Sequence, residues 1–200
     1  MTGGEIWQDL LEGNARFVNN KMTHPNMEPG YRVSISEVQQ PKAVILSCAD
    51  SRIPPEIVFD QGLGDLFTIR LAGNVASDEA IGSIEFGAKY LGIPLVVVLG
   101  HKNCVAVMNA CKGYSENDHV RHITKILEPA VERAKKMEGN LYDNAVDENI
   151  KIVIEKLKQT GPVLKPLHDE GKLAIIGAHY DMKTGLVETV EFPVNVNSVQ

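Results

Sequence analysis

The sequence has little cysteine and little positive charge. Its 200 residues include three cysteines, Cys48, Cys104 and Cys111, and so small and odd a number argues against a scaffold of disulfide bonds. Lys and Arg number 20 and Asp and Glu number 26, which gives a formal net charge of −6. This balance excludes the basic surface of a general nucleic-acid binder and the polybasic segment that attracts anionic lipid. We therefore expect neither nucleic acid nor a membrane among its partners.

Long hydrophobic runs are also missing. The longest cover residues 43–46, 93–99 and 173–176, all much shorter than a membrane-spanning helix. The N-terminus contains neither a basic region nor a long apolar run, so we expect no secretory signal and a cytoplasmic protein. Hydrophobic residues still make up 44% of the chain, which is typical of a globular protein with a packed core.

No linker, repeat or low-complexity segment divides the chain, so we expect one domain over residues 1–200. Apolar residues at helical spacing over 5–19, followed by a polar segment with prolines over 20–38, predict an N-terminal helix and a loop or extended arm. This helix and arm occupy residues 1–38, and residues 39–200 form the expected core.

The hydrophobic pattern predicts an α/β protein with a central, mostly parallel sheet flanked by helices. Helical patterns alternate along the chain with short apolar runs that favour buried strands, and this alternation is typical of a parallel sheet. The predicted strands are 43–46, 66–71, 95–99, 173–178 and 186–190. The predicted helices after the first are 77–91, a helix from 103, 119–137 and 144–158.

Reactive side chains directly follow two of the predicted strands. One strand is followed by Cys48, Asp50 and Arg52, and another by His101 and Cys104. Because ligands of parallel α/β sheets bind beyond the carboxyl ends of the strands, we expect these side chains to share one site.

Two thiolates and one imidazole form a ligand set that suits a tetrahedral zinc ion with an open fourth position. His101 and Cys104 are three residues apart at a strand-to-helix turn, so both side chains can reach one ion. Two other interpretations stay open. The cysteines can be small buried residues, or one thiol can act as a nucleophile with His101 as its base, which leaves the other cysteine without a role.

Asp50 and Arg52 flank Ser51 in the loop after the first of these strands. A guanidinium at this distance keeps the carboxylate ionised and fixes its rotamer. From spacing alone an ordinary loop ion pair explains the two residues as well. Beside a metal, the carboxylate would accept a proton from bound water or take the open position. Two thiolates leave zinc formally neutral and acidify its water less than three histidines do, so such an acceptor becomes more useful.

The remaining cysteine and histidines fit structural roles better. Cys111 lies on the helix that starts near Cys104, and we expect it to pack in the core. His119 and His122 share one face of a charged helix, which favours exposure to solvent. His179 follows a predicted strand and is expected to support the end of the sheet.

The chain resembles the β-class carbonic anhydrases. Residues 48–52 match the family motif C-x-D-S-R, and residues 101–104 match H-x-x-C after a valine-rich strand. Further similar stretches extend the resemblance over nearly the whole chain, at residues 13–17, 55–67, 70–74, 82–85, 177–181 and 184–185. The resemblance implies one zinc ion per subunit, bound by Cys48, His101 and Cys104. It also implies a zinc-bound water or hydroxide that attacks carbon dioxide to give bicarbonate.

The resemblance further implies roles for residues around the metal. Asp50 would orient the hydroxide or, in a closed form, take the fourth zinc position, and Arg52 would draw it away from the metal. Gln39 matches a glutamine that binds substrate, often across a dimer interface. Phe67 and Ala72 match apolar positions of the pocket.

The family usually forms dimers or tetramers in which N-terminal helices embrace the partner, so the resemblance implies a homodimer or homotetramer. An apolar stripe of Trp7, Leu10 and Leu11 on the first helix suits this arrangement, because the stripe needs a surface to cover it.

Two pocket positions depart from the family pattern. Val105 stands where the family has Gly after the second cysteine, and its branched side chain would narrow the pocket or shift the Cys104 backbone. Phe86 stands where many relatives have Tyr, which removes a hydroxyl. The altered pocket therefore leaves two alternative functions open: a carbonyl sulfide or carbon disulfide hydrolase with the same fold, or a zinc-stabilised binding module without catalysis. The two cysteines leave a third open, a thiol-redox protein with a reversible disulfide between Cys48 and Cys104.

Overall fold

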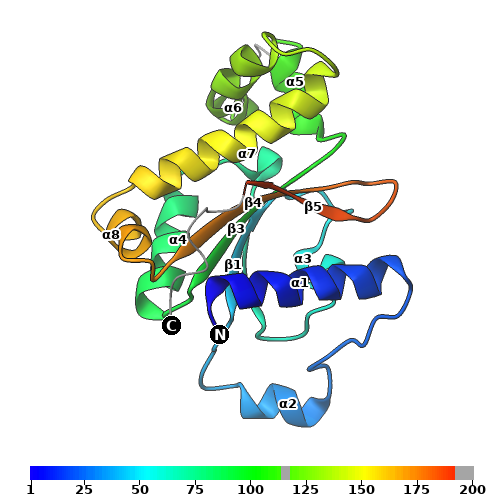
Figure 1. Ribbon diagram of the computed structural model, residues 1–200, viewed down its shortest axis with the longest axis vertical. Helices are drawn as coiled ribbons and strands as arrows, with labels where there is room; N and C mark the ends of the chain where they lie inside the picture. Colours follow the sequence, from blue (N-terminus) through cyan, green and yellow to red (C-terminus); the bar gives the residue numbers. More distant parts are fainter. Residues whose placement is uncertain (114–117, 192–200) are drawn as a thin grey trace.

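The computed structural model describes residues 1–113 and 118–191 (Figure 1). Its centre is a five-stranded sheet with the order β2-β1-β3-β4-β5. The first four strands run parallel, and the fifth is antiparallel to its neighbour. This arrangement confirms the mostly parallel α/β sheet expected from the sequence. The strands are β1 (Ala43–Ser47), β2 (Leu66–Arg70), β3 (Leu95–His101), β4 (Ala174–Tyr180) and β5 (Val187–Glu191).

The two strands that lead to the predicted metal ligands, β1 and β3, are the most apolar strands of the sheet. Every residue of β1 and of β3 is buried, because each strand has a neighbour on both edges and helices on both faces. A continuous apolar run is what such a position requires. The edge strand β2 is half-buried throughout.

Helices cover both faces of the sheet. On one face, α4 (Asp78–Tyr90) and α7 (Leu141–Gln159) pack closely, and a side chain at Gly177 of β4 would collide with Ile150 and Ile154 of α7. On the opposite face, α1 (Gly3–Val18) approaches so closely that a side chain at Gly3 would collide with Ala174 of β4. The glycines are therefore needed where helix and strand backbones meet.

The start of α1 is fixed by a capping box. The Thr2 hydroxyl accepts a hydrogen bond from the backbone N–H of Glu5, and the Glu5 carboxylate accepts one from the backbone N–H of Thr2. The two bonds satisfy amide groups that the first helical turn leaves without partners.

The apolar stripe of α1 is covered by the same chain, which corrects the expectation that a partner subunit is needed for it. Trp7 and Leu10 are buried, at 3% and 0% exposure. The Trp7 ring packs edge-on against Phe59 with centroids 6.1 Å apart, and its Nε1 donates to Thr189 Oγ1 at 3.3 Å. Leu11 is partly buried against the same core.

Several short helices were not predicted from the sequence. The expected loop over 20–38 contains α2 (Pro29–Ser34), which begins at a proline, a residue that the first helical position tolerates. Such pieces are too short to show a helical period. The other short helices are η1 (Ala72–Asn74) and α8 (Leu164–Asp169); α3 (Pro55–Val58), α5 (Val105–Cys111) and α6 (Val120–Ala134) complete the fold. Among the described residues, no helix combines the length and apolar character that crossing a membrane requires.

Candidate metal centre

Cys48, His101 and Cys104 meet at the carboxyl ends of β1 and β3. Their donor atoms all lie within 4.8 Å of one another, and the two Sγ atoms are 3.9 Å apart. The side chains are buried, at 4%, 0% and 3% exposure. Because β1 and β3 are parallel neighbours in register, residues 56 positions apart in the sequence become adjacent in space. The structure thus brings together the three predicted ligands.

The His101 ring is oriented for coordination. Its Nδ1 lies 2.9 Å from the Lys102 carbonyl oxygen, which can only accept, so Nδ1 carries the proton. The lone pair is then on Nε2, which is buried and has no hydrogen-bond partner within residues 1–113 and 118–191. A buried acceptor of this kind calls for a partner. A zinc ion would satisfy it, and the Cys₂His donor set leaves the fourth tetrahedral position open.

The two thiols differ in acidity. Cys48 accepts hydrogen bonds from the Cys104 thiol and from the backbone N–H of Gly73, and these bonds lower the pKa of its thiol. Sharing its proton with Cys48, together with burial, raises the pKa of the Cys104 thiol. One thiolate is thus readily formed, and binding of a cation would release the second proton.

An ion pair stands beside the cluster. Arg52 Nε donates to Asp50 Oδ1 at 2.9 Å, and Nη2 donates to Oδ2 at 2.7 Å. These bonds lower the pKa of Asp50 to about 2. Asp50 Oδ2 also lies 4.0 Å from His101 Nε2. An ionised and oriented carboxylate is therefore held next to the three donor atoms, as expected for Asp50 and Arg52.

A residue that was not predicted holds the loop between these groups. Arg70, the last residue of β2, donates from Nε to the Cys48 carbonyl oxygen at 3.1 Å and from Nη2 to the Asp50 carbonyl oxygen. Both acceptors are backbone atoms, so no residue type or spacing in the sequence indicates the contact.

A cavity of about 350 Å³ opens beside the cluster. Ala72 and Val105, both predicted as pocket residues, contribute to its lining together with Cys48, Asp50 and Cys104. A second wall comes from α5 and α6 and was not predicted. Its residues are Ala106, Asn109, Val120, Ile123 and Thr124. The spacing of the last three identifies one helix face, but it does not reveal what that face covers.

Three other predicted substrate residues lie outside this lining. Gln39 is exposed in the segment before β1. Phe67 of β2 stacks on Phe86 of α4 with ring centroids 6.3 Å apart, and Phe86 is 46% exposed. The substrate contacts of Gln39, Phe67 and Phe86 stay predictions.

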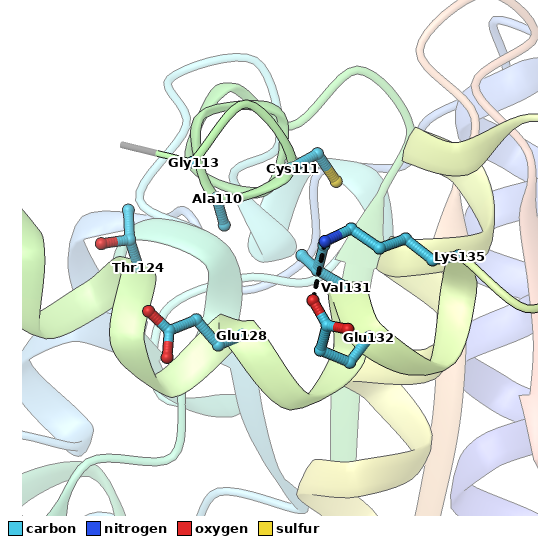
Figure 2. Close-up of a pocket in the computed structure, with 8 residues that line it drawn as sticks. All are labelled: Ala110, Cys111, Gly113, Thr124, Glu128, Val131, Glu132 and Lys135. Atoms are coloured by element: carbon cyan, nitrogen blue, oxygen red, sulfur yellow. Dashed lines mark hydrogen bonds and ion pairs between the residues drawn. The ribbon is translucent and has the colours of Figure 1, made fainter. Parts of the chain in front are cut away.

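The third cysteine is separate from the cluster. Cys111 of α5 lines a cavity of about 220 Å³. Figure 2 shows its side chain across from the ion pair between Glu132 of α6 and Lys135, which follows the end of that helix. Burial raises the pKa of its thiol, and its side chain packs against the hydrophobic core. Cys111 therefore packs against the core as predicted, but it is only partly buried and stands at the edge of the core.

The other singled-out histidines take structural or exposed positions. His179 of β4 lies between Asp147 of α7 and Glu188 of β5, with each ring nitrogen 3.0 Å from a carboxylate oxygen. It ties the end of the sheet to a helix, as expected. His119 and His122 are exposed near the start of α6, with ring centroids 6.5 Å apart.

Comparison with known proteins identifies the family. A family model described as carbonic anhydrase matches residues 43–187. The chain is 35% identical to a carbonic anhydrase of Mycolicibacterium smegmatis over 186 residues, which are 91% of this chain and 90% of that protein. It is also 35% identical to carbonic anhydrase 2 of Mycobacterium tuberculosis over 183 residues, covering 90% and 88% of the two chains.

Solved structures agree with this result. The β-carbonic anhydrase CcaA matches with a TM-score of 0.73 and 26% identity, covering 92% of this chain and 94% of that one. A tetrameric β-carbonic anhydrase from Sordaria macrospora shares the fold, with a TM-score of 0.74 and 20% identity over 92% and 96% of the chains. The chain belongs to the β-carbonic anhydrase family.

Proposed function

We propose that this chain is a zinc-dependent carbonic anhydrase that converts carbon dioxide and water to bicarbonate and a proton, and back. The observation that carries the proposal is the convergence of Cys48, His101 and Cys104 beside the Asp50–Arg52 pair, at the wall of one cavity. Family membership supports the same reaction.

The residues around the cluster have separable roles. Zinc bound by the three donors would supply a Lewis acid that acidifies a water molecule. Asp50 is ionised at neutral pH, because the pKa of its carboxyl is about 2. So weak a base accepts a hydrogen bond from the nucleophile and orients it rather than removing its proton. Arg52 keeps the carboxylate in this orientation through two bonds.

The cavity suits an apolar substrate on one side of the site. Carbon dioxide carries no charge, and Ala72, Val105 and the apolar residues of α6 offer it no competing hydrogen bonds. We assign the exposed Gln39 and Phe86 and the half-buried Phe67 to contacts completed in a homodimer or homotetramer. In support, the relative from Sordaria macrospora is described as tetrameric. We further propose a cytoplasmic enzyme whose single domain has its catalytic core in residues 39–200.

Metal analysis combined with stopped-flow hydration of carbon dioxide tests the proposal. We expect one zinc per subunit and rapid hydration, and we expect Cys48→Ser to lose both. Cys111→Ser is the matched control, because it removes a thiol outside the cluster and should keep metal and activity. A wild-type protein without stoichiometric zinc would contradict the proposal.

Val105 favours one second candidate function. It is 60% exposed and lines the cavity next to the ligand Cys104, so it alters the shape of the substrate site. A changed pocket suits hydrolysis of carbonyl sulfide or carbon disulfide by the same metal centre. Rates with carbon dioxide and with carbonyl sulfide, measured before and after Val105→Gly, separate the two functions. The second candidate predicts that wild type prefers carbonyl sulfide and that the variant loses this preference.

A further inference from the structure

A backbone amide contacts one of the two sulfurs. Gly73 donates its N–H to Cys48 Sγ at 3.2 Å. Gly73 lies in η1 with φ 69° and ψ 19°, in the left-handed region that side chains disfavour. A Cβ atom at this position would also stand 3.1 Å from Leu127 Cδ1. The glycine is therefore needed to direct this amide at the sulfur.

The same glycine is held from its other side by a helix that contributes no metal ligand. Asn149 of α7 is 2% exposed, and its Nδ2 donates to the Gly73 carbonyl oxygen at 3.0 Å. Glycine has the softest backbone dihedrals of all residues, so its neighbouring peptide groups rotate easily unless something fixes them. Asn149 anchors the peptide group that follows Gly73, whereas the N–H that reaches Cys48 belongs to the peptide group before it. With one of the two groups held, the N–H can turn away from the sulfur only by rotation about the backbone bonds of Gly73 itself.

We propose that Asn149 is a positioning residue of the metal centre, which holds the Gly73 N–H on the Cys48 sulfur and thereby tunes the charge of that thiolate. The inference rests on the proposed function, since it requires Cys48 to bind metal. An N–H bond to sulfur withdraws charge from a thiolate ligand. Such tuning matters here, because two full thiolate charges neutralise a divalent ion and weaken its Lewis acidity.

Replacing Asn149 with leucine removes the amide donor and keeps the number and branching of the side-chain heavy atoms. Without the fixed N–H, the Cys48 thiolate becomes a stronger electron donor. In the cobalt(II)-substituted protein we expect the sulfur-to-cobalt charge-transfer band to move to longer wavelength. A released Cys48 sulfur donates more charge but is no longer held in place, and we expect the loss of orientation to dominate, so that zinc affinity, measured by competition with a chelator, falls about tenfold.

Asn14→Leu is the matched control. Asn14 is also 2% exposed and also donates to backbone carbonyls, at Val58 and Gly185, but it contacts none of the three ligands. Both variants lose a buried amide, and both are compared at a temperature at which circular dichroism shows them folded. We expect only the Asn149 variant to change the cobalt band and the zinc affinity. If Asn149→Leu does not fold, Asn149→Ser serves, because its short hydroxyl cannot span to Gly73.

The possible results distinguish the positioning role of Asn149 from the proposed zinc-dependent function. A wild type with normal metal content, together with Asn149 variants whose band and zinc affinity match it, contradicts the positioning role alone. An equal change in Asn14→Leu also contradicts it, because the effect would then follow from general loosening of the fold. A wild type that takes up neither zinc nor cobalt contradicts the proposed function as well.

Discussion

At the residue scale, the ion pair at the site has an asymmetric geometry. Asp50 is mostly shielded, with 15% side-chain exposure, whereas Arg52 is 52% exposed. An exposed ion pair adds little to stability. We interpret the pair as a contact that holds the Asp50 carboxylate beside the three metal ligands. Loss of Arg52 should therefore change the reaction rate rather than the free energy of unfolding.

Arg52→Ala should slow carbon dioxide hydration about 100-fold with little loss of stability, because Asp50 loses the two bonds that orient it. The hydration rate of Arg52→Lys should lie between those of Arg52→Ala and wild type, since a lysine keeps the charge but cannot form the two parallel hydrogen bonds. Stopped-flow rates and zinc content check the prediction. Near wild-type hydration by a zinc-loaded Arg52→Ala protein would show that the pair has no kinetic role.

The three proposed ligands and the ion pair were predictable, because unusual residue types follow two strands. The residues that orient them were not. Arg70, Gly73 and Asn149 act through backbone atoms, and such contacts depend on the path of the chain rather than on residue spacing. Their roles become visible only when β2, η1 and α7 are placed around the site.

At the element scale, α1 is part of the core of its own chain. Leu10→Ala should lower the free energy of unfolding by about 3 kcal/mol, because it leaves a cavity at a fully buried position. Leu11→Ala, at the half-buried neighbouring position, should cost roughly 1 kcal/mol. Denaturant unfolding measures both. An equal and small loss in the two variants would mean that α1 does not pack as described.

The link between α7, β4 and β5 gives a pH prediction. The Asp147 carboxylate, followed by Glu188, raises the pKa of His179 above its ordinary value of about 6.5. The protonated ring therefore contributes stability that is complete below about pH 6.5 and is lost as pH rises through the folded-state pKa. The stability difference between wild type and His179→Gln should be larger at about pH 6 than at about pH 9.

Thermal unfolding at the two pH values measures this difference. His122→Gln is the control, because His122 is exposed on α6 and bridges no pair of elements in the described parts of the chain. A difference for His179→Gln that stays constant with pH would contradict the prediction.

Among the elements, strands were predicted better than short helices. A buried strand such as β3 is a continuous run of apolar residues, which can be recognised in the sequence without knowledge of the fold. By contrast, α2 and α8 have six residues each and are set by local prolines and tertiary contacts. The burial of the α1 stripe was also misjudged, because amphipathicity shows that a face is covered without showing by which chain.

At the scale of the whole molecule, the metal is expected to add stability without creating the fold. The hydrophobic core extends over all five strands and most helices, and Cys48 and Cys104 are only two of its many members. Removing zinc with a chelator should therefore leave the far-ultraviolet circular dichroism unchanged. Tm should fall by roughly 10 °C, which corresponds to the loss of about 4 kcal/mol of binding when free zinc exceeds its Kd about 1,000-fold. Adding zinc back should restore Tm; loss of the helical signal on chelation would contradict the prediction.

The position of β1 and β3 at the middle of the sheet also bears on how fast a bound metal ion can leave the protein. Backbone amides of buried central strands exchange with solvent through the rarest openings of a protein, whereas edges and loops open often. His101 ends β3, Cys48 directly follows β1, and Cys104 lies three residues beyond His101. We therefore expect fraying of the sheet edges to leave a bound ion in place, and spontaneous metal loss from the folded protein to proceed by side-chain motion at the cavity. The rate of metal release should then not depend on how often other parts of the chain open locally.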